Sequence, residues 1–266
     1  MGWKAATFNV NGVRARLDHL SAWIPQQQPD VLCLQETKCQ EGAFPRQFFE
    51  DLGYRCLVKG EKSFNGVAVL TRDPPESAVT ETGDPVLDQE ARFLAVKVRG
   101  VWVLNTYVPQ GRSPEDPAFR YKLDFLDHTG DWIRQRFTPQ TPLLWTGDIN
   151  VAPQPMDVFD PKRLDGQVGF HPEERAKLDE LMGWGLVDLF RRLHPREKQF
   201  TFWDYRLPKS FKRNLGWRLD HMLVTEPMAD ACVECFVDTT LRAKPKSSDH
   251  TPLVAVFALS RTTREA

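Results

Sequence analysis

The 266-residue sequence predicts an α/β sandwich, in which two packed β-sheets are flanked on the outside by helices. Short runs rich in β-branched and aromatic residues recur along the chain, and several alternate between apolar and polar positions, as strands do. A few longer segments instead have the three- and four-residue apolar spacing of amphipathic helices. Because such a helix has only one apolar face to bury, it covers the outside of a sheet.

The runs predict strands over residues 4–10, 31–35, 54–59, 66–71, 92–98, 101–107, 143–146, 219–225, 232–237 and 253–259. Helices are predicted where apolar residues share one face: Val13, Leu17, Leu20 and Ile24; then Leu123, Leu126, Gly130, Ile133 and Phe137; and a third helix over 172–182. Residues 153–170 and 207–215 interrupt these patterns with Pro, Gly and charged residues, which is typical of long functional loops.

The length suits one domain, which we place over residues 1–259, followed by a polar tail over 260–266 that we expect to fray. Lys plus Arg number 35 against 36 Asp plus Glu, so that any attraction to a polyanion must be local. Five cysteines, an odd number in mostly apolar runs, indicate reduced thiols. With neither a signal peptide nor a membrane-length apolar run in the sequence, we expect a cytoplasmic monomer that does not engage membranes.

Four short segments place carboxylate, carboxamide or imidazole groups beside strand-like runs: LQETK at 34–38, TGDINVAP at 146–153, GWRLDHM at 216–222 and SSDHTP at 247–252. Hydrolysis of a phosphodiester requires oxygen ligands for a hard cation, an oriented water and a donor to the developing charge. The side chains that supply this set are Glu36, Asp148, Asn150, Asp220, Asp249 and His250. The segments therefore indicate a metal-assisted phosphodiesterase.

Glu36 follows the apolar run 31–34, so that a buried strand delivers its carboxylate to a sheet edge, where it can bind Mg²⁺. The alternative is a surface glutamate at a strand end. Asn9 ends the first strand in the same way and can orient Glu36 or a metal-bound water, although Asn-Val-Asn-Gly at 9–12 is also ordinary turn chemistry.

Asp148 and Asn150 are two residues apart, a separation that sends both side chains to one side of an extended backbone. The alternative is a turn in which the Asp side chain accepts from the backbone, a possibility that Gly147 and Pro153 favour. Asp220 can hold one ring nitrogen of His250 while the other faces a phosphate. Tyr107 ends a strand from which its phenol can reach a phosphate oxygen; otherwise it is an edge aromatic.

Two basic segments adjoin these positions. The stretch 206–218 contains five basic residues and no acidic one, and Arg242, Lys244 and Lys246 directly precede Asp249. Charge runs are usually solvated loops. Beside catalytic segments we interpret them as contacts to a phosphate backbone, made by Lys209, Lys212 and Arg213 among others.

These segments, with NGVAVL at 65–70, TYVPQG at 106–111 and GDINVAPQPMDVFDPKRLDGQVGFHPEER at 147–175, resemble the exonuclease III family of apurinic/apyrimidinic endonucleases. The resemblance covers about residues 5–259 in the family's order. It implies a four-layered αββα sandwich like that of DNase I, with two mostly antiparallel sheets. It also implies cleavage of double-stranded DNA 5′ to abasic sites with Mg²⁺ or Mn²⁺, and 3′-to-5′ exonuclease and end-cleaning activity on blocked 3′ ends, which is DNA base excision repair.

By the same resemblance, Glu36 is the main metal ligand, with Asn9 and Asp249 as its neighbours, and Asp148 orients or deprotonates the attacking water beside Asn150. His250, paired with Asp220, then binds a non-bridging oxygen, and Tyr107 lies at the scissile phosphate. The remaining positions face DNA: Phe202, Trp217 and Leu219 form a pocket for a base-free sugar, with ordinary packing as the alternative, and Arg112 inserts near the lesion.

Two other functions fit parts of the sequence. A phosphatase or sphingomyelinase of the same fold would share the metal and Asp–His machinery, but the basic stretch 206–218 and the WRLD segment favour DNA. A catalytically inactive nucleic-acid binder would be expected to lack residues that bind the metal or act as general base. This sequence retains all six: Glu36, Asp148, Asn150, Asp220, Asp249 and His250.

Overall fold

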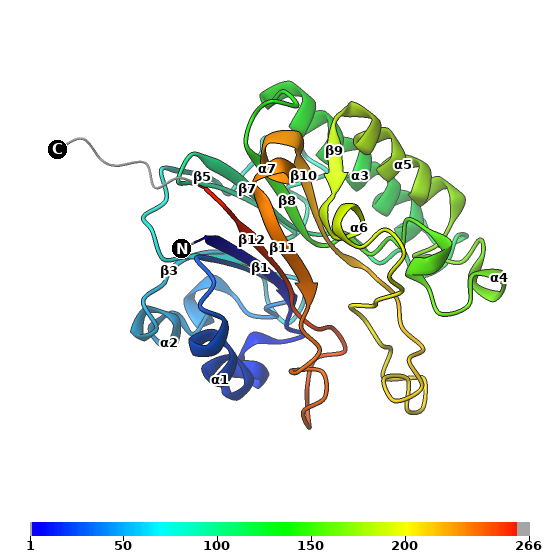
Figure 1. Ribbon diagram of the computed structural model, residues 1–266, viewed down its shortest axis with the longest axis horizontal. Coiled ribbons are helices and arrows are strands. Elements are labelled where there is room, and N and C mark those ends of the chain that lie inside the picture. The colour runs from blue at the N-terminus through cyan, green and yellow to red at the C-terminus, as the bar shows by residue number, and fades with distance from the viewer. Residues whose placement is uncertain (1, 260–266) are drawn as a thin grey trace.

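The computed structural model describes residues 2–259, which fold into two six-stranded sheets packed face to face. The strand order is β11-β12-β1-β2-β4-β3 in the first sheet and β5-β6-β7-β8-β10-β9 in the second. Each sheet has one parallel pair, β1 with β2 and β7 with β8, and the other pairs are antiparallel. Helices cover both outer faces (Figure 1), so the predicted four-layered αββα sandwich is confirmed.

The strands of the first sheet are β1 (Trp3–Asn9), β2 (Val31–Gln35), β3 (Arg55–Lys59), β4 (Val67–Thr71), β11 (Cys232–Val237) and β12 (Leu253–Phe257). Those of the second are β5 (Ser77–Val79), β6 (Phe93–Val98), β7 (Val101–Tyr107), β8 (Leu143–Asp148), β9 (Leu186–Asp188) and β10 (Asp220–Thr225).

The inner strands bury both of their faces, one in the core between the sheets and one under helices, whereas the edge strands β3, β5 and β11 are partly exposed. In β1, Trp3 and Ala5 face the core between the sheets, whereas Ala6 and Phe8 contact the helical layer. Because alternate residues point to opposite faces, a strand between two layers must be apolar throughout, which is why β2 is fully apolar up to Gln35.

The first sheet is covered by η1 (Val13–Arg16), α1 (Leu17–Gln27), η2 (Glu41–Ala43) and α2 (Arg46–Asp51), which Figure 1 shows below it. The second is covered by α3 (Pro117–Arg136) and α5 (Pro172–Trp184). The remaining short helices are η3 (Pro155–Asp157), α4 (Pro161–Leu164), α6 (Leu189–Leu193) and α7 (Glu226–Ala231).

Helices α3 and α5 begin at strong sequence signals. Asp116 accepts a hydrogen bond from the amide of Ala118, and Pro117 occupies the first turn of α3. His171 and Glu174 form a reciprocal cap at the start of α5.

Every predicted strand and all three predicted helices are present, with shifted ends. The strand predicted over 143–146 continues to Asp148, and the one predicted over 253–259 ends at Phe257. The pattern missed β5 and β9, which have three residues each and are too short for a periodic signal. The predicted tail, 260–266, lies outside the described residues. Within residues 2–259, no helix has the combined length and apolar character that a bilayer crossing needs.

Candidate active site

The polar residues singled out in the sequence meet at one end of the paired sheets. Asn9 ends β1 opposite Gln35 of β2, so that Glu36 emerges beside it. In the second sheet, Asp148 at the end of β8 pairs in register with Asp220 at the start of β10. Strand register therefore brings together residues that are far apart in sequence.

Asn9 connects the two sheets across this end. Its Nδ2 donates to Glu36 Oε1 and to Asp148 Oδ2, both at 2.8 Å, and its Oδ1 accepts from the amide of Asn11 at 3.0 Å. In this arrangement Asn9 holds two carboxylates side by side. The turn contact considered for Asn9 and its contact with Glu36 thus occur together.

His250 and Asp220 form a buried dyad. The ring Nδ1 lies 2.8 Å from Asp220 Oδ2, and Nε2 lies 3.6 Å from Asp148 Oδ2. Burial lowers the pKa of His250, but Asp220 and Asp148 outweigh it and raise that pKa to about 10. The imidazole is therefore held as a cation whose Nε2 hydrogen faces the other site groups.

Burial raises the pKa of Asp148 to about 7, with Asp220 and Glu36 acting in the same direction and His250 opposing them. Burial also acts to raise the pKa of Glu36, but hydrogen bonds from Lys38 and Asn9 bring it below the usual value. Burial, together with Glu36 and Asp148, raises the pKa of Tyr107 well above that of a free phenol, so that Tyr107 is a hydrogen-bond donor at neutral pH. The site thus combines a carboxyl group that titrates near neutrality with two fixed donors.

Asn150 sits in a tight turn after β8. Its amide donates to Asp148 Oδ1 at 3.1 Å, and its Nδ2 donates to Val108 O at 2.9 Å. The backbone is left-handed here, with φ of 55° at Asn150, so the two side chains do not follow the extended geometry that the spacing suggested. The turn alternative is correct for the backbone, and Asp148 and Asn150 nevertheless line one pocket.

Gly147 permits the close approach of β8 to β7. Its φ is 132°, and a Cβ at this position would lie 2.0 Å from Thr106 O. Only glycine can therefore precede Asp148 at this point of the sheet.

Asp249 lies slightly apart from the other carboxylates. Its Oδ1 accepts from Asn11 Nδ2 at 2.9 Å, and Asn11 Oδ1 accepts from Lys38 Nζ at 2.5 Å. Lys38 also pairs with Glu36 Oε2 at 2.8 Å. Asp249 is thus linked to Glu36 through Asn11 and Lys38.

One cluster has the donor atoms that a metal ion requires. Ligand atoms of Glu36, Asp148 and His250 lie within 4.8 Å of one another. Because the charged imidazole has no free lone pair, the two carboxylates are the groups that can hold a cation, and oxygen ligands suit Mg²⁺ or Mn²⁺. The residues present therefore fit a divalent cation at Glu36 and Asp148.

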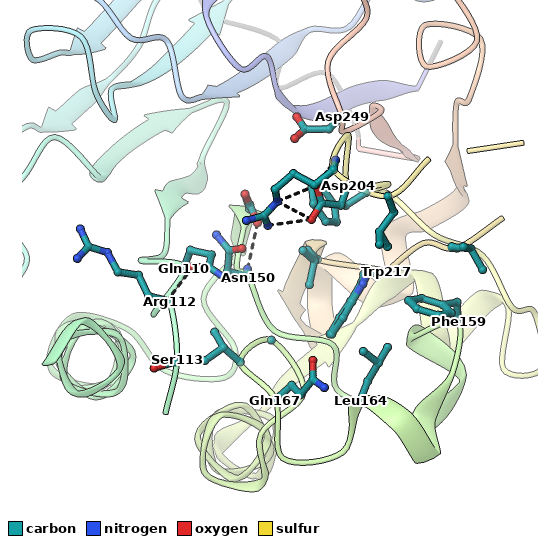
Figure 2. A pocket seen from close by; sticks show the side chains of 18 of the residues that line it. Gln110, Arg112, Ser113, Asn150, Phe159, Leu164, Gln167, Asp204, Trp217 and Asp249 are labelled. Atoms are coloured by element: carbon teal, nitrogen blue, oxygen red, sulfur yellow. Dashed lines mark hydrogen bonds and ion pairs between the residues drawn. The ribbon is translucent and has the colours of Figure 1, made fainter. Parts of the chain in front are cut away.

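Six of the side chains described above open into a pocket of about 1180 Å³, which we call the catalytic pocket: Glu36, Tyr107, Asp148, Asn150, Asp249 and His250. Phe202, Trp217 and Leu219 line it beyond Asp148, and Figure 2 shows the Trp217 indole beside Leu164. Arg112 also lines the pocket, but its side chain is 77% exposed and points away from the other lining residues in Figure 2.

The basic stretch 206–218 divides into two parts. Lys209, Lys212 and Arg213 are exposed, and Arg213 reaches the pocket wall. Arg218, which we grouped with the phosphate contacts, is fully buried and binds Asp157 and Asp188, with N···O distances of 2.7 Å to each. That interpretation is wrong for Arg218, because two buried carboxylates take its charge.

A model of the endonuclease/exonuclease/phosphatase family matches residues 6–250. The chain belongs to this family. It is 37% identical to exodeoxyribonuclease III of Haemophilus influenzae, a match that covers 96% of this chain and 99% of that protein. It is also 31% identical to an exodeoxyribonuclease of Bacillus subtilis, with the same two coverages. The predicted resemblance to the exonuclease III family is confirmed.

Solved structures of family members agree with this fold. An AP endonuclease from Archaeoglobus fulgidus has a TM-score of 0.93 and 38% identity, covering 97% of this chain and all of that one. The 3′ phosphatase NExo from Neisseria, bound to a product DNA hairpin, has a TM-score of 0.92 and 33% identity, covering 96% and 99% of the two chains.

In this family member, sequence patterns missed several site groups. Lys38 lies within the LQETK segment, but a lysine at a strand end is usually solvated, so the sequence does not indicate its ion pair with Glu36. Asp204, which forms an ion pair at 2.8 Å with Arg206 of the predicted basic stretch, lines the pocket from the loop after Phe202. Lys122, on a helix, has no local signal for its contact with Asn150 O at 2.7 Å.

Proposed function

We propose that this protein is a DNA repair nuclease that hydrolyses the phosphodiester 5′ to abasic sites, with 3′-to-5′ exonuclease and 3′-end-cleaning activity. The supporting observation is the convergence of Glu36, Asp148 and His250 in one pocket, with the His250 ring held by the buried Asp220. The relatives named exodeoxyribonuclease III and AP endonuclease support the choice of DNA and of this reaction.

In this proposal the attacking water binds at Asp148. The raised pKa of Asp148 suits a group that orients this water and accepts its proton as the water attacks. Asn150, whose amide binds the Asp148 carboxylate, keeps that carboxylate in place and lines the same pocket. Proton acceptance and positioning thus belong to one turn of the chain.

His250 and Tyr107 serve as donors to the phosphate. The imidazolium donates from Nε2 to a non-bridging oxygen, while Asp220 fixes the ring through Nδ1. The Tyr107 phenol, which lies beside Glu36, donates to the scissile phosphate. Donors set in a buried site stabilise the charge that develops during attack.

Glu36 is the proposed principal ligand of Mg²⁺ or Mn²⁺, with Asn9 and Asp249 beside it. When bound, such an ion neutralises charge on the phosphate and on the leaving oxygen. Asn9 donates to both the Glu36 and the Asp148 carboxylates, and these hydrogen bonds favour the charged form of each.

The pocket wall is the proposed site for the base-free sugar. Phe202, Trp217 and Leu219 give it an apolar lining that a sugar without a base can enter. Arg112 and the exposed Lys209, Lys212 and Arg213 are placed to contact the duplex around it. These basic residues favour DNA over a lipid or inositol phosphate as the substrate. The presence of all six polar residues named in the sequence analysis argues against a catalytically inactive nucleic-acid binder. The proposal places a monomeric enzyme inside the cell, where it has access to DNA.

The test is incision of a labelled duplex with one abasic site, compared with intact, nicked and single-stranded DNA across a metal titration. We expect incision to stop on chelation and to return with Mg²⁺ or Mn²⁺. Asp148→Asn and His250→Asn should each lower the rate by roughly a hundredfold or more. Asp18→Asn, at an exposed position outside the pocket, is the matched control. Full activity of either site variant would refute the assignment.

A further inference from the structure

A second cavity, of about 480 Å³, lies next to the loop that precedes His250. We call it the basic groove, and it is lined by Arg16, Tyr205, Arg242, Lys244, Lys246 and Ser247. Four of these six residues are cations, and none is a carboxylate. Within residues 2–259 these four cations form no ion pair with a carboxylate, unlike Arg206 nearby, which pairs with Asp204.

Arg242 is held in place before any ligand arrives. Its Nη2 donates to Trp203 O at 3.2 Å and its Nη1 to Ser247 Oγ at 3.3 Å. The guanidinium also stacks on Tyr205 and Phe211, with 5.4 and 5.1 Å to the ring centroids. Its Nε is buried and has no partner in the described structure. A planar cation fixed in this way loses little entropy on binding and suits a phosphate group.

The loop that carries Lys244 and Lys246 adds two exposed ammonium groups to this fixed cation. Flexible lysines at the rim bind phosphates as point charges, without reading bases. The groove therefore fits a repeated anion rather than a single small molecule.

The basic groove shares a wall with the catalytic pocket. Trp203 N donates to Asp249 O at 2.9 Å, which ties the segment before Tyr205 to the loop that carries His250. Asp204 and Arg206 line the catalytic pocket on either side of Tyr205, whose hydroxyl donates to Ser247 O in the groove. A polyanion bound in the catalytic pocket can therefore continue past Tyr205 into the groove, whose own lining contains no carboxylate.

We propose that the basic groove binds backbone phosphates of the same DNA, away from the scissile phosphate. This inference rests on the proposed function, because the shared wall is what connects the groove to a DNA substrate. The groove supplies affinity that is independent of base sequence, whereas the catalytic pocket selects the lesion. A duplex RNA or an acidic protein is the competing occupant.

The test compares Lys244→Gln/Lys246→Gln with the wild-type protein in binding to an intact labelled duplex. Anisotropy is measured without divalent metal over a series of salt concentrations. Each lost phosphate contact lowers the slope of log K against log salt by about 1, so that the double variant should lose about 2 and bind roughly tenfold more weakly. Arg242→Lys, which keeps the charge but loses the planar fork, should weaken binding with a smaller change in slope.

Lys97→Gln is the matched control, since Lys97 lies on β6, outside both cavities, and pairs with Glu76. An unchanged slope in the double variant, or an equal loss in the control, would overturn the proposal. So would a double variant that loses affinity for duplex RNA or polyglutamate but keeps its affinity for DNA.

Incision kinetics separate the two proposals. With metal present, the double variant should show a raised KM and an unchanged kcat on abasic duplex. A wild-type protein that leaves abasic DNA intact refutes the proposed function, while the binding slopes still test the groove by themselves. A lower kcat in the double variant at saturating DNA would contradict a role in affinity alone.

Discussion

Replacing Lys122 by Met should destabilise the protein and displace the loop that carries Asn150. Lys122 and Glu174 form an ion pair with neither side chain exposed, at 2.6 Å between Nζ and Oε1. The same Nζ donates to Asn150 O at 2.7 Å and to Gln110 O at 3.3 Å. Glu174 Oε2 in turn accepts from Gly169 N at 2.7 Å. One buried pair therefore joins three loops that line the catalytic pocket.

The magnitude follows from what Lys122→Met leaves behind. Glu174 becomes a buried carboxylate without a counter-charge, and removal of one partner of such a pair costs about 3–5 kcal/mol. This is a large part of the stability of a typical domain, which is roughly 5–15 kcal/mol. Lys122→Met/Glu174→Gln removes both charges, and the Gln oxygen can still accept from Gly169. The double variant should therefore recover about 2 kcal/mol or more, because residues in contact couple by about 0.5–3 kcal/mol.

The free energy of unfolding is measured by urea denaturation, followed by tryptophan fluorescence, with the m-value checked for constancy. Incision kinetics are measured on the same variants. Because Lys122 positions Asn150 without touching substrate, Lys122→Met should lower kcat, and Lys122→Arg should restore part of it. A loss of stability below about 1 kcal/mol in Lys122→Met, or a double variant whose loss equals the sum of the single losses, would refute this account of the pair.

Two further predictions concern the pocket wall and the buried charges beneath it. Trp217→Ala should lower the preference for abasic over intact duplex by roughly tenfold, measured as the ratio of kcat/KM values, because an apolar surface of the proposed sugar site is lost. An unchanged ratio would mean that Trp217 serves only in packing. Burial acts to raise the pKa values of Asp157 and Asp188, but Arg218 brings both below the usual range. Since these carboxyls titrate lower in the folded state, their contribution is present above about pH 4 and is lost as pH falls through the folded values. The melting temperature should drop below pH 4, and less steeply in Asp157→Asn; a wild-type melting temperature that stays constant down to pH 2.5 would contradict this.

The sequence was sufficient for ten of the twelve described strands and for most residues of the candidate site, for one physical reason. Buried strands must be apolar, so a polar residue at the end of such a run stands out, as Asn9, Glu36 and Asp148 do. Strand pairing then brings these ends together, a step for which sequence alone offers only the family resemblance.

Charges that are neutralised inside the fold could not be predicted. Arg218 belongs to a basic run, and nothing beside it in the sequence indicates that Asp157 and Asp188 bind it. Lys122 and Glu174 lie on two different helices, and their pairing exists only because α3 and α5 pack together. Pairing of this kind depends on tertiary distance, whereas patterns along the chain report only local periodicity.

The orientation of the polar side chains in the candidate site depends on unusual backbone at the strand ends. Glu36 and Asn150 have φ values of 49° and 55°, in the left-handed region, where Glu is uncommon. A residue in that region costs of order 1–3 kcal/mol and persists only where its surroundings fix it. The surroundings are present: Glu36 O accepts from Gly12 N at 2.7 Å, and Asn150 O accepts from Lys122 at 2.7 Å. The strands therefore determine where the site lies, and the constrained turns after β2 and β8 determine where its carboxylates point.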